Sequence, residues 1–403
     1  MEASNSKPAL LFLVHRIPFP PNKGDKIRSF NVLKFLAERF CIHLGAFIDD
    51  QNDFQYVDNL NDYCASTCLL PLNANSAKLK SLSGFLTAQP LTLPYYFDNK
   101  MQSWVNEVID KENIDKALVF SSSMAQYLSG DQYGSLKRLI DFVDIDSDKW
   151  SQYVKSAALL MKPVYLYEAK MLLAWEKKIA AEFDHSFFVS ESESNLFKQF
   201  SPSSAAKISY FNNGVDTEYF SPDCAFDSPY ENNQAVIVFT GAMDYWANVD
   251  AVVWFSQQVL PVLCRQNPQL KFYIVGSKPD DKVKALAKSP NIVVTGMVDD
   301  VRPYLAHAAI AVAPMRIARG IQNKVLEAMA MEKLVVVSPQ GYEGINARNG
   351  QELLLAGNGD EWVDAINHLL SSEDASFMGN AARQRVLKDY SWQGSLAQLE
   401  QCL

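Results

Sequence analysis

The 403-residue chain has no hydrophobic run long enough to cross a membrane, because a spanning helix needs roughly 18 consecutive apolar residues. The apolar stretch nearest the N-terminus, 9–14, is interrupted by His15 and Arg16, which is not the pattern of a signal peptide. Cysteine is also sparse, and the close pair Cys64 and Cys68 has no second Cys/His pair at zinc-like spacing. We therefore expect reduced thiols and a cytoplasmic protein, with attachment to the inner face of the cytoplasmic membrane left open.

Clustered positive charge and metal ligands are missing as well. The net charge is -9 and no long Lys/Arg run is present, so we expect no nucleic-acid partner. The five histidines show no metal spacing, and the acidic run that starts at Asp144 has lysines where a calcium loop needs Gly and Glu. No Gly-x-Gly-x-x-Gly follows a candidate strand, which disfavours a dinucleotide oxidoreductase. We expect neither a metal nor a cofactor.

What the sequence does contain is a regular alternation of short β-rich runs with longer amphipathic segments, typical of βαβ units and parallel sheets. Its length and its 48% hydrophobic content fit two globular domains. Turn residues at 212–216 and 221–223 separate two such series. The fold class is therefore α/β, with two Rossmann-like domains facing across a cleft, 1–213 and 214–388. Strands are predicted at 10–14, 42–47, 117–121, 138–143, 186–189, 235–240, 271–275, 292–295, 309–313 and 334–337, and helices from 27 onward, at 101–112 and at 164–182.

One segment, 314–330, combines a strand, a glycine turn and a helix. The strand ends at Ala313, Gly320 permits a tight turn, and a helix is predicted from Ile321 onward. Free N–H groups and the positive dipole end at such a helix start favour a phosphate. Lys324 lies in the first turn and Glu327 on the same side, and the preceding Arg316 and Arg319 extend the positive charge. An ordinary crossover helix with a solvated charged face explains the periodicity equally well.

The sequence ARGIQNKVLEAMAM at 318–331 resembles the donor site of retaining glycosyltransferases of family 4. It is most similar to the sugar transferases associated with bacterial exopolysaccharide and PEP-CTERM/exosortase loci. The resemblance extends over almost the whole chain, through LVHRIPFPPNKGDKIRSF (13–30), VDIDSDKW (143–150), FTGAMDYWANVDAVVWF (239–255), VTGMVDDVRPYLAHA (294–308) and DYSW (389–392). It implies the GT-B architecture, with the nucleotide on the second domain and a C-terminal helix, 389–403, that crosses back to the first.

The resemblance also implies roles for residues of the second domain. Glu327 would bind the ribose hydroxyls, and Arg316 and Lys324 the diphosphate. Two departures from the family pattern matter. Arg319 replaces the first Glu of the general motif, which leaves the donor sugar open, and the loop after the first strand has no Arg or Lys for the diphosphate. The other donor-binding candidates are Gly241 at the start of that loop, Gly296 and Val298 near the nucleobase, and Gly320 and Ile321 at the helix start.

Candidates in the first domain come from loops that follow its strands. In the loop 20–28, Gly24 and Arg28 are donor-binding candidates, and Lys23, Asp25 and Lys26 are candidates for acceptor or phosphate contacts, with Asp25 as a helix N-cap the alternative. Asp144 and Asp146 are catalytic candidates that would orient or deprotonate the acceptor, with capping of the next helix the alternative. His15 is the third catalytic candidate, since it alone of the histidines stands at a strand end facing the predicted cleft.

The resulting hypothesis is retaining, metal-independent transfer of a sugar from a UDP- or GDP-linked donor to a hydroxyl of a lipid-linked glycan in bacterial polysaccharide biosynthesis. The alternatives are a nucleotide-sugar epimerase or glycan phosphorylase of the same fold, and a non-catalytic protein that binds a nucleotide sugar. The segment 78–97 is apolar, basic and aromatic. It fits either peripheral membrane contact or an ordinary packed helix and loop.

Overall fold

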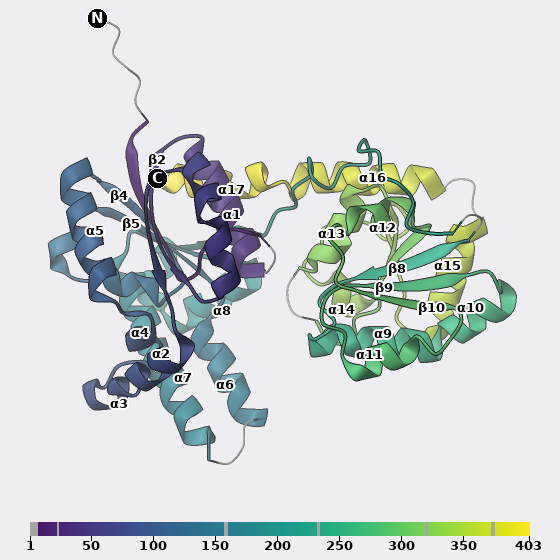
Figure 1. Cartoon of the computed structure of the whole chain (residues 1–403), viewed down its shortest axis with the longest axis horizontal. Coiled ribbons are helices and arrows are strands. Elements are labelled where there is room, and N and C mark those ends of the chain that lie inside the picture. The colour runs from purple at the N-terminus through teal and green to yellow at the C-terminus, as the bar shows by residue number, and fades with distance from the viewer. Residues whose placement is uncertain (1–6, 22–23, 157–159, 232–233, 319–320, 372–374) are drawn as a thin grey trace, which may run out of the picture. The chain divides into compact units, whose positions relative to one another are not determined.

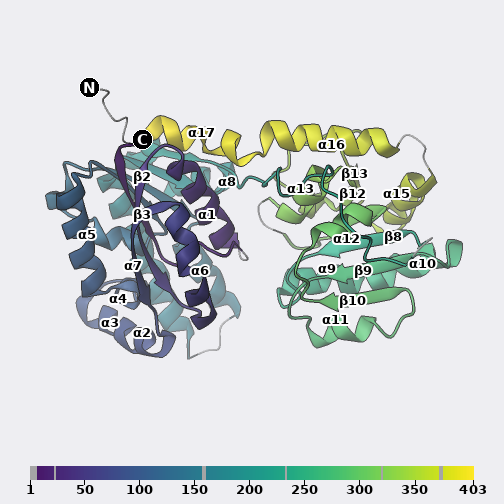
Figure 2. The same ribbon diagram turned by 45° about the horizontal axis from the view of Figure 1, so that its top comes forward.

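The computed structural model describes residues 7–21, 24–156, 160–231, 234–318, 321–371 and 375–403. The chain divides into two compact units (Figures 1 and 2). The first unit comprises Met1–Asn212 with Leu396–Leu403, and the second comprises Asn213–Ser395. Each unit has one parallel β-sheet with helices on both faces. The predicted α/β fold class is therefore confirmed.

The first unit is built on a seven-stranded sheet with the order β3-β2-β1-β4-β5-β6-β7. Its central strands are continuous apolar runs, as burial on both faces requires; residues 10–14 of β1 are essentially inaccessible to solvent. The strands are β1 Ala9–Val14, β2 Cys41–Ile48, β3 Cys64–Pro71, β4 Lys116–Phe120, β5 Lys137–Val143, β6 His185–Phe188 and β7 Ile208–Tyr210. The helices are α1 Gly24–Ala37, α2 Ala74–Ser81, α3 Ser83–Thr87, α4 Thr92–Tyr96, α5 Asn99–Glu112, α6 Asp146–Ser156, α7 Lys162–Glu182 and α8 Glu191–Phe200, with 3₁₀ turns at Gln51–Asp62, Met124–Tyr127, Asp131–Tyr133 and Pro202–Lys207.

The second unit has a six-stranded sheet with the order β10-β9-β8-β11-β12-β13. Phe255, Phe272 and Trp362 pack ring against ring in its core. The strands are β8 Val236–Thr240, β9 Lys271–Val275, β10 Ile292–Gly296, β11 Ile310–Ala313, β12 Leu334–Val337 and β13 Leu354–Leu355. The helices are α9 Trp246–Gln258, α10 Leu260–Gln266, α11 Asp281–Leu286, α12 Arg302–His307, α13 Asn323–Ala330, α14 Pro339–Tyr342, α15 Gly359–Ser371 and α16 Ala375–Asp389. The last helix, α17 Trp392–Cys402, returns the chain to the first unit.

The strand orders identify where each unit is built to bind a ligand. In the first sheet the order reverses between β1 and β4, and in the second between β8 and β11. Loops leave the carboxyl ends of such neighbouring strands in opposite directions, which opens a crevice at that edge. We therefore expect the ligand sites in the segments that follow β1, β4, β8 and β11.

Arg28 is part of the core and not of a ligand site, so its prediction as a donor contact is wrong. Its side chain is fully buried and donates from Nε and Nη2 to the two carboxylate oxygens of Asp141, at 2.7 and 3.1 Å. It also donates to the carbonyl of Phe211 at 3.0 Å and lies over that ring. Lys26 is likewise enclosed and bonded to Asp53 at 2.6 Å. Both cations fasten α1 to the sheet and its loops.

The buried Arg28–Asp141 ion pair should contribute measurably to the free energy of unfolding. Arg28→Met leaves Asp141 charged and buried without a counter-ion, although the Val143 N–H still donates to it, so urea unfolding should show a loss of about 3–5 kcal/mol. Adding Asp141→Leu should restore most of that loss, because no buried charge then remains. Arg39→Met is the control, since Arg39 pairs with Glu400 at a partly exposed site and should cost about 1 kcal/mol or less. Equal losses for Arg28→Met and Arg39→Met would contradict this role of the pair.

Candidate functional site

Backbone hydrogen bonds connect the loops that follow three neighbouring strands of the second unit. The N–H of Gly241, after β8, donates to Val275 at 3.0 Å, and that of Gly276, after β9, donates to Gly296 at 3.2 Å. A Cβ on Gly276 would lie 1.7 Å from the carbonyl oxygen of Gly241, so only glycine allows this approach. Gly241 and Gly296 were predicted site residues; Gly276 was not, although a glycine directly after a buried strand is a readable signal. Of the three, Gly241 lies next to α13, since a Cβ built on it would come 3.4 Å from Cε of Lys324.

The helix α13 begins at Asn323, two residues later than the predicted start at Ile321. No side chain caps its first turn in the described chain, and the side-chain oxygen of Asn323 is buried without a partner among the described residues. Uncapped N–H groups and the positive end of the helix dipole favour an anion at this position. Two of the predicted donor residues, Arg319 and Gly320, lie outside the described residues.

Lys324 projects from this first turn and is held by a residue of α9. Its Nζ donates to Oδ1 of Asn248 at 2.9 Å and lies 5.2 Å from the centre of the Phe239 ring. Asn248 in turn donates to the carbonyl of Ala242 at 2.9 Å, which fixes its amide. Burial lowers the pKa of Lys324 to about 8, against the opposing charge of Glu327. Asn248 lies inside the 239–255 motif but was not predicted as a site residue.

Glu327 is half-buried one turn further along α13. Burial raises its pKa to about 7, although the positive charge of Lys324 opposes the shift. Its carboxylate has no hydrogen bond or ion pair within the described part of the chain. A desolvated cation and a desolvated acceptor thus lie side by side at the β8–β11 switch point. This pair suits a ligand that brings both negative charge and hydroxyl groups.

The remaining donor candidates of the second unit that the structure describes are Arg316, Ile321 and Val298. Arg316 is 52% exposed and makes a two-pronged ion pair with Asp250, in which Nε lies 2.9 Å from Oδ2. It would have to leave Asp250 to hold a phosphate. Ile321 and Val298 are half-buried, the former just before α13 and the latter in the loop after β10. Their roles stay predictions.

A cavity of about 930 Å³ lies within the first unit. Its polar wall comes from the loops after β1, β4 and β5, and its other walls come from α4, α6 and α7. All three predicted catalytic residues, His15, Asp144 and Asp146, line it, and so does Asp25. Gly24 begins α1 at an exposed position, and a Cβ there would meet nothing within 4 Å. The three catalytic candidates therefore lie around one cavity, and their catalytic roles stay predictions.

His15 and Asp25 are joined through a small polar cluster. Nε2 of His15 lies 3.4 Å from Oδ2 of Asp25, and Arg16 donates to the same oxygen at 2.6 Å. The His15 ring stacks on Phe120 and meets Tyr96 edge-on, and its Nδ1 is buried without a partner among the described residues. Burial alone would raise the pKa of Asp25, but the His15 hydrogen bond and the Arg16 charge hold it well below its usual range. Asp25 is thus an ionised acceptor inside α1, and the capping alternative is wrong.

Asp144 and Asp146 share one cation. Lys149 Nζ lies 2.8 Å from Asp144 and 3.3 Å from Asp146. Ser121, directly after β4, and Val143, the last residue of β5, have backbone φ angles of 78° and 70°, which non-glycine residues seldom adopt. Such strain is often retained at functional sites, and both residues line the cavity.

Glu176 supports this acidic loop from the core. It is fully buried on α7 and accepts hydrogen bonds from the backbone and hydroxyl of Ser147, at 3.2 and 2.5 Å. Burial raises the pKa of Glu176 to about 8, and the charge of Asp146 adds to the shift. No sequence motif singled out Glu176, because its position depends on how α7 packs on α6.

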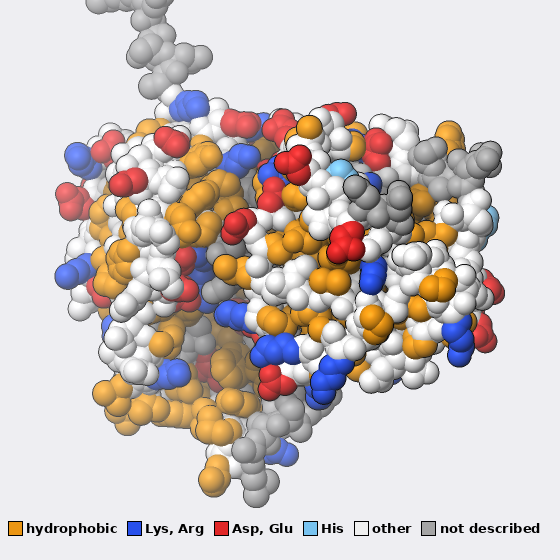
Figure 3. Space-filling view, turned by 45° about the vertical axis from the view of Figure 1, so that its right-hand side comes forward, with side chains coloured by type: hydrophobic (Ala, Val, Ile, Leu, Met, Phe, Trp, Pro, Cys, Tyr) orange, Lys and Arg blue, Asp and Glu red, His pale blue; other side chains and the backbone are white. Residues whose placement is uncertain are grey.

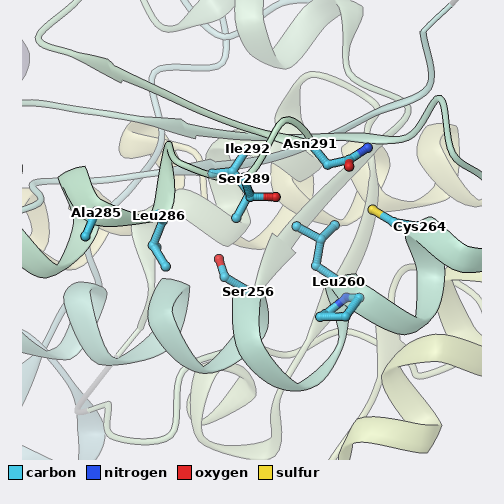
Figure 4. A pocket seen from close by; sticks show the side chains of 9 residues that line it. Ser256, Leu260, Cys264, Ala285, Leu286, Ser289, Asn291 and Ile292 are labelled. Atoms are coloured by element: carbon cyan, nitrogen blue, oxygen red, sulfur yellow. The ribbon is translucent and has the colours of Figure 1, made fainter.

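A second, smaller cavity of about 330 Å³ is a poor ligand site (Figure 4). Its walls include Ser256 of α9, Leu286 of α11, and Asn291 and Ile292 at the start of β10. It therefore adjoins the amino end of a parallel strand, whereas ligands of such sheets bind at the carboxyl ends.

Comparison with known proteins places this geometry in context. Residues 234–372 match the family model described as glycosyl transferases group 1. Sucrose-phosphate synthase from Thermosynechococcus elongatus is similar in structure, with a TM-score of 0.68, 17% identity and 98% of each chain covered. HepE from Anabaena, solved in complex with UDP, also gives a TM-score of 0.68, with 13% identity and 98% of each chain covered. The fold is GT-B.

A curated relative has no assigned activity. It is an uncharacterised 44.6 kDa protein in the cps region of Klebsiella pneumoniae, 20% identical over 383 residues that cover 91% of each chain. The domain match and the GT-B fold together support glycosyl transfer. Within the described ranges, no helix combines the length and apolar character needed to cross a bilayer.

The raised pKa of Glu176 predicts how stability depends on pH. A carboxyl whose folded pKa lies above its unfolded value of 4.5 stabilises the fold fully below pH 4.5, and this contribution is lost as pH rises through about 8. Glu176→Gln keeps the Ser147 contacts without the titration. Its melting temperature should therefore exceed that of the parent increasingly between pH 5 and pH 8. Glu191→Gln, at an exposed position of α8, should show no such trend, and parallel profiles for parent and Glu176→Gln would contradict the assignment.

Proposed function

We propose that the chain is a retaining, metal-independent glycosyltransferase that moves a sugar from a UDP- or GDP-linked donor to a hydroxyl of a lipid-linked glycan in bacterial polysaccharide biosynthesis. The observation that carries the proposal is the Lys324–Glu327 pair beside the uncapped start of α13. The UDP complex of the structurally similar HepE supports a nucleotide donor. The resemblance of 318–331 and its companion motifs to exopolysaccharide sugar transferases supports the pathway.

The donor roles follow from the chemistry of the two side chains. The protonated Lys324 and the first N–H groups of α13 bind the diphosphate, and Glu327 accepts hydrogen bonds from the ribose hydroxyls. Asn248 holds Lys324 in place, since its Oδ1 accepts from the ammonium. Arg316, once released from Asp250, is a further candidate for the diphosphate, and so is Arg319, which lies outside the described residues. Lys324 and the first N–H groups of α13 are in place before the substrate arrives, which favours charge that develops on the diphosphate.

The reaction breaks the bond between the anomeric carbon and the diphosphate oxygen, and the electron pair leaves with the diphosphate. The acceptor oxygen bonds to the anomeric carbon on the same face, which retains the configuration, and its proton passes to the departing diphosphate. In the first unit, Asp144 and Asp146 orient the acceptor hydroxyl. The ring of Trp150 in the same cavity offers a flat face on which a sugar can stack.

Turnover of labelled nucleotide sugars with a lipid-linked glycan extract tests the activity. The parent should release nucleoside diphosphate and label the glycan. Lys324→Ala and Glu327→Ala should each lower kcat/KM by roughly 100-fold, because each removes a group from the bound donor. Lys282→Ala, an exposed lysine of α11, is the matched control and should leave kcat/KM unchanged. Interconversion of the sugar without any acceptor would indicate an epimerase instead, and nucleotide binding with no transfer would indicate a sensor.

The lowered pKa of Lys324 predicts how donor binding depends on pH. The ammonium form that binds the diphosphate dominates below about pH 8 and is lost above it. Calorimetric affinity for UDP or GDP should therefore fall several-fold between pH 7 and pH 9 in the parent. Lys324→Met should bind weakly at both values and show a flat profile. A parent affinity that rises over this interval would contradict a charged Lys324 in the site.

A further inference from the structure

One end of the first unit exposes an unusual number of large apolar side chains. Of the nine such side chains that the described part of this unit exposes, eight come from two segments: 79–86, and the described residues 153–154 and 160–166 around the start of α7. Leu86 is 90% and Leu160 is 91% exposed, so these side chains pack against almost nothing. The space-filling view shows hydrophobic side chains gathered at the lower end of this unit, where α2, α3, α6 and α7 lie (Figures 1 and 3).

The two segments form one continuous surface. The ring of Phe85 on α3 packs against that of Tyr167 on α7, with centroids 4.7 Å apart. The Tyr167 hydroxyl donates to the carbonyls of Gly84 and Gln89. Glu168 of α7, which is buried, accepts from the first N–H groups of the α4 turn, at 2.5 and 3.0 Å. These contacts fix α3 and α4 against the start of α7.

The charge of this surface differs in sign from that of the whole chain. Residues 63–97 and 149–167 contain no Asp or Glu, whereas at the chain's frequency of 46 acidic residues in 403 about six would be expected. Their lysines are 78, 80, 149, 155 and 162. Lys149 is neutralised by Asp144 and Asp146, but Lys78 is exposed with no ion pair in the described chain. An apolar surface bordered by lysines is complementary to an anionic membrane, where basic side chains meet phosphates and apolar ones enter the interface.

The exposed surface continues into the large cavity of the first unit. Tyr153 and Met161 belong to the exposed segments and also line the cavity, as does Lys78 next to the first segment, and Leu91 and Val164 extend the apolar wall inward. The same cavity ends at His15, Asp144 and Asp146. An amphiphile with its tail in a bilayer therefore has an apolar path from the exposed surface to the polar end.

We propose that the surface formed by 79–86, 153–154 and 160–166 docks the protein on an anionic phospholipid membrane, and that the acceptor enters the cavity of the first unit directly from that membrane. The docking stands on the surface alone. The entry of an acceptor rests on the proposed function, because only a transferase needs one.

Sedimentation with vesicles tests the docking without any nucleotide or sugar. The parent should sediment with vesicles of phosphatidylethanolamine and phosphatidylglycerol and stay in solution with pure phosphatidylcholine vesicles. Added salt should weaken the binding, since the lysine contribution is screened. The Leu82→Asp/Leu86→Asp variant removes two exposed leucines that do not line the cavity, and should lower the vesicle affinity by roughly tenfold or more. The matched control is Phe377→Asp, whose side chain is 80% exposed on α16 of the second unit; its vesicle affinity should equal that of the parent.

Three results would overturn the proposal. The first is failure of the parent to bind anionic vesicles at low salt, and the second is binding of the Leu82→Asp/Leu86→Asp variant equal to that of the parent. The third is a dimer in light scattering that this variant loses, which would make the surface a contact between two copies. Melting temperatures equal to that of the parent establish that the variants are folded. Affinity for UDP or GDP, measured in parallel, separates the docking proposal from the proposed function. The Leu82→Asp/Leu86→Asp variant should bind the nucleotide as the parent does. A parent that binds no nucleotide would count against the donor site alone and not against membrane docking. Transfer to acceptor embedded in vesicles should fall with vesicle binding, and transfer to a detergent-dispersed acceptor should not.

Discussion

The proposed donor site depends on a lysine that the fold holds half-buried, with the side-chain amide of Asn248 as its partner. Lys324 donates to Asn248, and no carboxylate lies within ion-pair distance of it in the described chain. A buried ammonium is costly unless an anion accompanies it, so the fold retains a charge that a ligand is needed to balance. Gly241, directly after β8, lies near it, and the segments after β9 and β10 follow along the same edge of the sheet. Their close approach, fixed by Gly276 against Gly241, leaves backbone instead of side chains at the edge where the nucleotide is proposed to bind.

In the first unit, by contrast, the charges on α1 and at the polar end of the cavity are already paired. Arg28 with Asp141 and Lys26 with Asp53 lock α1 to the core, while Asp25 is held ionised by His15 and Arg16. The polar end of the cavity is therefore rigid and carries fixed acceptors, which suits hydroxyl groups more than a phosphate. Glu176, buried on α7, accepts a hydrogen bond from Ser147 and so supports the acidic segment that carries Asp144 and Asp146. The two units thus offer different chemistry, a desolvated cation in one and ordered carboxylates in the other.

Much of this arrangement was predictable from the sequence. Every one of the ten predicted strands exists, because buried parallel strands are continuous apolar runs that stand out against their surroundings. The strands that were missed are β3, β7 and β13, which lie at or next to the sheet edges and are short or weakly apolar. His15 and Asp144, picked out because they follow predicted strands, do line the cavity of the first unit, and their catalytic roles stay predictions. Arg28 was misassigned, since a charged residue in a motif gives no sign that Asp141, 113 positions away, will enclose it. Asn248 and Glu176 were missed for the same reason: their partners come from other helices.

The central claim is that a nucleoside diphosphate binds at the start of α13, and a crystal structure of the chain with UDP or GDP tests it most directly. The account predicts diphosphate oxygens within hydrogen-bond distance of Lys324 Nζ and of the first N–H groups of α13, with the ribose hydroxyls on Glu327. A nucleotide bound at any other position, with Lys324 still on Asn248 and no phosphate beside it, would contradict the account.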